Sequence, residues 1–175
     1  AGGHAFVRVR YDAALLGRLT GAIGSLAPIE RYQLVDDTWA TVLAGSTPAS
    51  TFIDLARSFG DETDLAVWGA ILTGLSWCER ILEGEPRARL RALVRSLARP
   101  AFDRLGLAAA PGEASPVRSL RGMLLASLAV LGDDPEVAAM AREEEVRSRR
   151  GEGIDPDVAA ASVGAVAARG GIADF

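Results

Sequence analysis

Apolar residues recur at intervals of three and four along most of the chain, which is the pattern of amphipathic helices. The clearest case lies between residues 62 and 83, where Leu65, Trp68, Leu72 and Leu75 fall on one face. Applied to the whole chain, the pattern predicts eight helices, at about 12–23, 28–44, 48–59, 62–83, 86–105, 116–131, 135–149 and 156–169.

Proline and glycine mark where these helices begin and end. Proline suits the first turn of a helix, because its missing N–H would have no partner there. Six prolines stand at such starts: Pro28, Pro48, Pro86, Pro116, Pro135 and Pro156. Pro100 instead lies inside the predicted helix 86–105, so we expect a kink or a break there.

The beginning of the chain has a different pattern. Between Phe6 and Tyr11, apolar residues alternate with Arg8 and Arg10, which predicts a short β-strand. One strand cannot form a stable sheet by itself. We therefore expect residues 1–11 to be the terminal strand of a preceding β-sandwich domain, and residues 12–175 to form a helical domain.

The predicted connections are mostly two to five residues long, which makes consecutive helices antiparallel. The predicted fold class is therefore all-α: an α-α superhelix of stacked antiparallel helix pairs, similar to HEAT or armadillo arrays, preceded by one short orphan strand. The loop 109–115, with Pro111 and Gly112, is the candidate boundary between two subregions.

Charge and composition argue against two classes of binding partner, nucleic acids and membranes. The chain has 19 arginines, no lysine and 23 acidic residues, a net charge of -4, which argues against nucleic acid. No apolar run approaches the roughly 20 residues of a membrane helix, so no membrane partner is expected. The lack of lysine beside abundant alanine, glycine and arginine indicates a GC-rich bacterial genome. The start has no signal-peptide pattern, and a cytoplasmic location is predicted.

Few residues could carry chemistry. His4 and Cys78 are the single histidine and cysteine, which excludes a disulfide and leaves a zinc site without ligands. Cys78 lies in an apolar helix and is expected to be a buried, inert thiol. Asp36 and Asp37 point about 100° apart on a helix, so they cannot act as a catalytic dyad. One of them is expected to face inward and bind a backbone group or an arginine.

A basic stripe is the strongest candidate for binding. Arg87, Arg91, Arg95 and Arg99 follow one another at four-residue spacing and so share one helix face. The stripe is either a solvated face or a contact for an anion, and in the second case Arg91 and Arg95 are the candidate contacts for a substrate carboxylate. No catalytic and no metal-binding residue is predicted.

Glycines and acids on the helix 62–83 have structural interpretations. Gly69 and Gly74 cost about 1 kcal/mol each inside a helix unless close packing compensates, which predicts that another helix crosses there. Asp61, Glu62 and Asp64 open this helix and are expected to cap its free N–H groups.

Several segments in register resemble the zinc aminopeptidases of the aminopeptidase-N and puromycin-sensitive type, which are gluzincin metallopeptidases. Residues 1–12 resemble the strand G-x-x-R-V-x-Y-D, and residues 26–39 resemble the helix L-S-P-x-D-R-x-x-L-x-D-D-x-F. Residues 61–68 resemble the helix start x-E-T-D-Y-x-V-W, and residues 104–107 and 131–135 are similar to later turns. Ala27, Glu30, Trp39 and Leu65 are conservative departures.

The resemblance implies a role without chemistry of its own. In that family the zinc ligands are H-E-x-x-H and a downstream glutamate, and one histidine cannot make that motif. The chain then corresponds to a non-catalytic helical domain of an enzyme that removes N-terminal residues from peptides. We expect zinc to be bound in the parent enzyme. This fragment alone is expected to bind no cofactor and to have no activity.

The resemblance also implies partners. In the family the helical domain caps the catalytic cavity and restricts substrate size, so peptide substrates would be met through the parent. The family continues with further helices, so we expect the helical domain to be truncated at its C-terminus. We therefore expect the fragment to self-associate through its exposed end or to be marginally stable. The alternative is a free-standing α-helical repeat scaffold that binds a protein partner; the upstream strand favours the aminopeptidase.

Overall fold

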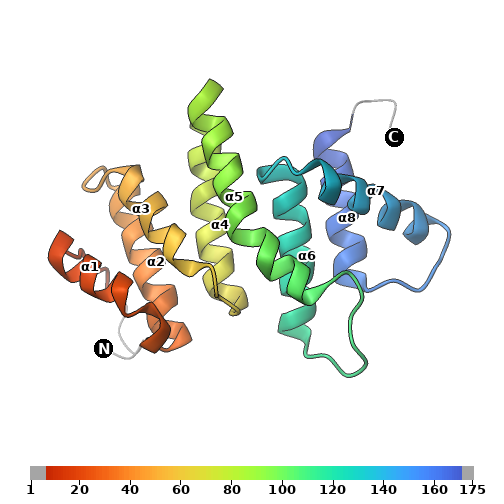
Figure 1. Cartoon of the computed structure of the whole chain (residues 1–175), viewed down its shortest axis with the longest axis horizontal. Helices are drawn as coiled ribbons and strands as arrows, with labels where there is room; N and C mark the ends of the chain where they lie inside the picture. Colours follow the sequence, from red (N-terminus) through yellow and green to blue (C-terminus); the bar gives the residue numbers. More distant parts are fainter. Residues whose placement is uncertain (1–6, 171–175) are drawn as a thin grey trace. The chain divides into compact units, whose positions relative to one another are not determined.

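The computed structural model describes residues 7–170, and every regular element in that range is helical (Figure 1). The chain divides into two compact units, Ala1–Arg80 and Ile81–Phe175. The first holds α1 (Ala13–Gly21), η1 (Ile23–Ser25), α2 (Pro28–Leu43), α3 (Ala49–Ala56), η2 (Arg57–Phe59) and α4 (Leu65–Ile81). The second holds α5 (Gly84–Leu105), α6 (Ser115–Ala126), the π-helical η3 (Ser127–Leu131), α7 (Pro135–Arg149) and α8 (Pro156–Arg169). The predicted all-α class is confirmed.

Local capping explains why the helix bounds follow the sequence so closely. Asp134 accepts hydrogen bonds at 3.0 and 3.1 Å from the backbone N–H groups of the first turn of α7. Asp155 does the same for α8, at 2.9 and 3.3 Å. At the other end of α5, Gly106 adopts φ +64, a conformation that costs a residue with a Cβ but not glycine.

Pro100 does not interrupt α5, which differs from the expected break. The helix is continuous from Gly84 to Leu105. Pro100 has no N–H to donate to the carbonyl of Ser96 one turn earlier. Both residues are exposed, so water can bind that carbonyl, and the lost hydrogen bond is tolerated.

In the first unit, α3 packs closely against α4 and α2. Figure 1 shows α2 and α3 antiparallel, as predicted from their short connection. The Phe52 ring of α3 lies against Gly74 of α4 so tightly that an added Cβ would sit 2.3 Å from the ring. The other side of Phe52 meets the Trp39 ring of α2, with centroids 5.0 Å apart. The close packing predicted at Gly74 is therefore confirmed, and the Phe52 side chain is what fills the space beside this glycine.

In the second unit, α8 packs against both α6 and α7. Figure 1 shows α6 and α8 running in the same direction, because α7 carries the chain back to the start of α8. Gly122 of α6 allows the close approach of α8, since a Cβ there would lie 2.7 Å from the backbone oxygen of Asp157. The loop 109–115 belongs to this unit, so it is not the boundary between subregions.

Residues 7–11, part of the predicted strand, have no regular secondary structure. A strand is defined by hydrogen bonds to a neighbour, and the described part of the chain offers no second strand to pair with. The segment instead lies along α2, through contacts of Arg8 and Tyr11.

Candidate functional site

Two of the segments that carry the family resemblance meet at an ion pair in the first unit. Arg31 of α2 donates from Nε to Oε2 of Glu62 at 2.7 Å and from Nη2 to Oε1 at 2.9 Å. Its third nitrogen, Nη1, donates to the carbonyl of Leu26 at 2.7 Å. One guanidinium therefore joins the start of α2 to the turn before α4.

Glu62 is the more buried partner, with its side chain 1% exposed. Burial alone would raise the pKa of its carboxyl, but the hydrogen bonds from Arg31 and from the backbone of Asp64 and Thr63 outweigh burial, and the pKa lies below its usual value. The backbone oxygen of Glu62 also accepts the indole N–H of Trp68 at 3.0 Å. The predicted capping role is confirmed for Asp64, which accepts two N–H groups of α4, whereas Glu62 accepts those of Thr63 and Asp64 in the turn before it.

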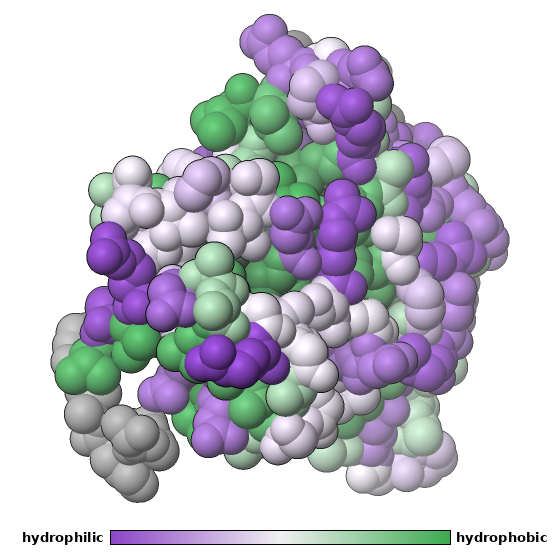
Figure 2. Space-filling model, turned by 60° about the vertical axis from the view of Figure 1, so that its left-hand side comes forward, coloured by the Kyte–Doolittle hydropathy of each residue, from purple (hydrophilic) through white to green (hydrophobic). Residues whose placement is uncertain are grey.

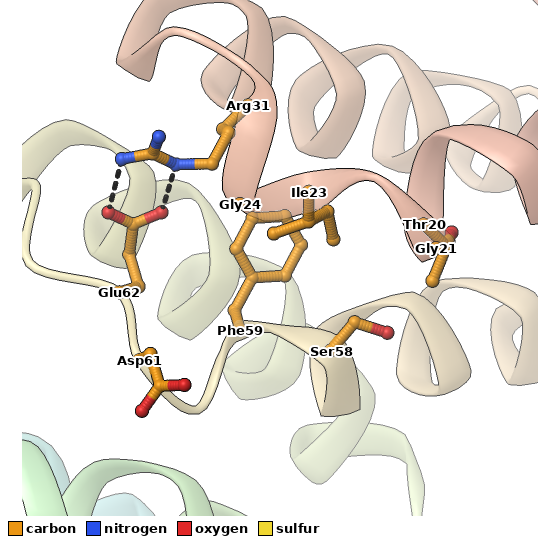
Figure 3. Close-up of a pocket in the computed structure, with 9 residues that line it drawn as sticks. All are labelled: Thr20, Gly21, Ile23, Gly24, Arg31, Ser58, Phe59, Asp61 and Glu62. Carbon is orange, nitrogen blue, oxygen red and sulfur yellow. Dashed lines mark hydrogen bonds and ion pairs between the residues drawn. The ribbon is translucent and has the colours of Figure 1, made fainter.

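A cavity of about 360 Å³ adjoins this pair, between the end of α1 and the turn after η2 (Figure 3). Its polar lining includes Asp61 and the hydroxyls of Thr20 and Ser58, beside the apolar Ile23 and Phe59. The lining offers hydroxyl and carboxylate oxygens and no histidine or cysteine. It has the groups to hold a polar ligand but no pair of nucleophile and base.

The basic stripe of α5 faces a turn of its own unit. Arg91 lies 2.9 Å from the carboxylate of Asp133, and Arg95 donates to the carbonyl of Gly132. Arg99 lies 3.4 Å from Asp134 in the same turn. Arg91 and Arg95, the candidate substrate contacts, are thus half-buried and already hold the turn between η3 and α7.

Asp133 is the centre of this cluster. Its φ of 49° lies in the left-handed region that few residues other than glycine adopt. Arg169 of α8 pairs with the same carboxylate and donates to the carbonyl of Ala129 at 2.7 Å. The hydrogen bond from Arg169 lowers the pKa of Asp133, and the charges of Arg91 and Arg95 act in the same direction.

The adjacent acids of α2 bind the segment that precedes α1. Arg8 pairs with Asp36, and its Nη1 lies 3.6 Å from Oδ1 of Asp37. Tyr11 donates its hydroxyl to Oδ2 of Asp37 at 3.3 Å. Asp37 is buried, so the prediction that one of the two acids faces inward and binds an arginine is confirmed.

Arg121 is a buried residue that the sequence did not single out. Its guanidinium forms two hydrogen bonds with Glu113, at 2.7 and 2.8 Å. It also donates to the carbonyl of Gly106 at 2.8 Å, at the end of α5. It thus ties the loop 109–115 to the end of α5. An arginine inside a helix with apolar neighbours was the one available signal.

The remaining candidates are Cys78 and His4. Cys78 is buried, as predicted, and burial raises the pKa of its thiol. His4 lies outside the described residues. Among residues 7–170 no group of histidine, cysteine or carboxylate side chains could hold a metal ion. No helix in that range is long and apolar enough to cross a membrane.

The surface is mixed. On the face drawn in Figure 2, hydrophobic residues lie in several separate areas between hydrophilic and neutral ones. The exposed large apolar side chains include Leu43, Trp77 and Ile81.

Comparison with known proteins decides what these motifs belong to. The family described as the ERAP1-like C-terminal domain matches residues 1–175, the whole chain. The chain belongs to this family.

The relatives of this family member are named as aminopeptidases. Aminopeptidase M1-A of Oryza sativa subsp. japonica is 32% identical over 160 residues, which are 87% of this chain and 18% of the relative. Puromycin-sensitive aminopeptidase of Caenorhabditis elegans is 29% identical over 175 residues, 97% of this chain and 18% of the relative. The chain therefore spans about a fifth of the length of the curated relatives that it matches.

Proposed function

We propose that this chain is the non-catalytic helical domain of a zinc-dependent aminopeptidase that removes N-terminal residues from peptides. The observation that carries the proposal is the family match over residues 1–175, together with relatives that are named as aminopeptidases. The zinc and its ligands belong to the parent enzyme, and this chain by itself is predicted to be inactive. A bacterial source and a cytoplasmic location remain predictions.

We further propose that the domain caps the catalytic cavity and restricts substrate size. The support is the resemblance of segments 26–39 and 61–68, which in this chain are joined by the ion pair of Arg31 and Glu62. A cap must hold its shape to exclude long peptides, and a buried two-point ion pair gives such rigidity.

Loosening the cap tests this proposal in the whole gene product. Gly74→Ala pushes a methyl group into the Phe52 ring, whereas Gly164→Ala, on α8, enters open space. We expect Gly74→Ala to raise the rate ratio of long to short peptides at temperatures where the enzyme stays folded, and Gly164→Ala to leave it unchanged. An equal ratio in all three proteins contradicts the size restriction.

The contact of Arg91 and Arg95 with a substrate carboxylate stays a proposal within this function. Its support is that Arg91 and Arg95 share one face of α5, where their charges and that of Arg169 act together on the carboxylate of Asp133. Because both candidates also hold the turn, Asp133→Asn is the matched control. If the substrate contact exists, the double variant Arg91→Ala with Arg95→Ala changes selectivity by peptide length, and Asp133→Asn does not. If the double variant and Asp133→Asn change selectivity equally, the two arginines have only a structural role.

Self-association of the isolated chain is the second expectation about partners. Sedimentation velocity at several concentrations measures it directly. A monomer at every concentration contradicts it. The alternative function, a free-standing scaffold for a protein partner, requires that the natural protein begin near Ala1.

A further inference from the structure

The segment 8–11 is attached to α2 by two side chains that reach two neighbouring acids. Arg8 bridges Asp36 and Asp37, and Tyr11 donates to Asp37 at 3.3 Å. The two acids point in different directions around the helix. Asp36 therefore meets Arg8 at the surface, where its side chain is 32% exposed, while Asp37 is 7% exposed and meets both partners.

Asp37 needs these partners. A buried carboxylate without a partner is costly, because it loses its water without gaining hydrogen bonds. The side chains that contact its oxygens, Arg8 and Tyr11, both come from the segment ahead of α1. The segment is thus part of the first unit and not a passive connection.

The attachment is also easily loosened. Arg8 is half exposed, with 52% of its side chain accessible, so salt screens its charge. Asp12, the next residue after Tyr11, caps α1 by accepting the N–H of Leu15 at 2.7 Å. The anchored residues therefore lie directly ahead of the point where the first helix starts.

We propose that Asp36 and Asp37 act as an electrostatic clasp that binds Arg8 and Tyr11 and fixes the direction in which the chain enters the helical domain. Opening the clasp frees the segment 8–11 from α2 and leaves the helices folded. A second part of the proposal rests on the proposed function. The clasp sets how the rest of the aminopeptidase is held against this domain, and therefore how open the catalytic cavity of that enzyme is.

Trypsin reports on the clasp in the chain as it exists. Cleavage after Arg8 requires several residues on each side of the bond to lie extended in the protease, which the closed clasp prevents. Arg150, exposed at the end of α7, is the reference site in the same molecule. The ratio of cleavage at Arg8 to cleavage at Arg150 cancels changes in protease activity.

We expect Asp36→Asn to raise this ratio about threefold and the double variant, with Asp37→Asn, at least tenfold. One molar NaCl raises the ratio in the wild type and not in the double variant. Asp54→Asn, which removes an exposed acid from α3, leaves it unchanged. A ratio within twofold of the wild type in Asp36→Asn and in the double variant overturns the clasp, and so does an equal rise in Asp54→Asn.

The proposed effect of the clasp on access to the catalytic cavity is measured separately. In the whole gene product, the double variant shifts the rate ratio of long to short peptides at least threefold. If cleavage at Arg8 accelerates but the peptide ratio stays constant, the control of cavity access is wrong. The proposed function fails by a different result, namely a coding region that holds no zinc motif ahead of Ala1.

Discussion

Arg31 and Glu62 form a two-point ion pair, 2.7 Å from Nε to Oε2 and 2.9 Å from Nη2 to Oε1, that joins the first turn of α2 to the turn before α4. Both residues come from segments that resemble aminopeptidase motifs. The structure gives these motif residues an architectural role: they fix two helices relative to each other.

Removing one partner of this pair should destabilise the fold strongly. Glu62→Ala leaves the Arg31 guanidinium, 16% exposed, without its carboxylate, and the expected loss is about 3–5 kcal/mol in the free energy of unfolding. Asp54→Ala, at an exposed pair with Arg57 of 3.7 Å, should cost about 0–0.5 kcal/mol. Urea unfolding measures both, and equal losses contradict the role of the pair.

Because of the Arg31–Glu62 pair, the free energy of unfolding should decrease at acidic pH. The pKa of Glu62 is lowered in the folded state from its ordinary value of 4.5, so its contribution is present above that pH and is lost as the pH falls through the folded value. The stability of Glu62→Gln should therefore depend less on pH than that of the wild type below about pH 5. Unfolding curves at several pH values check this, and parallel slopes refute it.

Arg121 should be as important as any apolar core residue. Its side chain is 1% exposed, and Arg121→Met leaves Glu113 and the carbonyl of Gly106 without their donor. We expect a loss of about 2–3 kcal/mol, because the substitution removes the charged hydrogen bonds of a buried guanidinium. Arg89→Met, at an exposed pair on α5, should change stability by less than about 0.5 kcal/mol. Thermal unfolding of the two variants distinguishes them.

The glycines offer a matched pair of alanine substitutions. Gly74→Ala places a methyl group 2.3 Å from Phe52, whose ring is held by Trp39, and should cost about 1–3 kcal/mol. Gly164→Ala meets nothing within 4 Å inside α8 and should stabilise by up to about 1 kcal/mol. Opposite shifts of the melting temperature confirm the close contact of Phe52 with Gly74; shifts of the same sign contradict it.

The phenol of Tyr11 should lose its proton at a higher pH than an ordinary tyrosine. Burial, the charge of Asp37 and the hydrogen bond to it raise the pKa of Tyr11 to about 12. The neutral phenol stabilises the fold below pH 10, and this contribution is lost as the pH rises through about 12. In a Tyr32→Phe background, absorbance at the phenolate band follows Tyr11 alone. Asp37→Asn should lower the midpoint, and an unchanged midpoint contradicts the contact.

The helix bounds could be predicted because their signals are local. Asp155 and Pro156 start α8 where the sequence places them, since a cap and a restricted φ act on their immediate neighbours. The close contact at Gly74 could also be predicted, because a glycine inside a helix destabilises it unless close packing compensates.

The partners across space could not be predicted. The spacing of the α5 arginines placed Arg91 and Arg95 on one face, but it did not show that this face meets the turn at Asp133. Arg121 was one of 19 arginines in the sequence, and periodicity does not distinguish a buried arginine from a solvated one. The break expected at Pro100 does not occur, because the cost of its missing hydrogen bond depends on exposure, which a local pattern does not give.

The central claim is that this helical chain is the C-terminal part of a zinc aminopeptidase, and reading the coding region directly upstream of Ala1 tests it. We expect an in-frame H-E-x-x-H motif followed by a glutamate about twenty residues later. A start codon immediately ahead of Ala1 would contradict the claim and make the protein a stand-alone helical module that binds a partner.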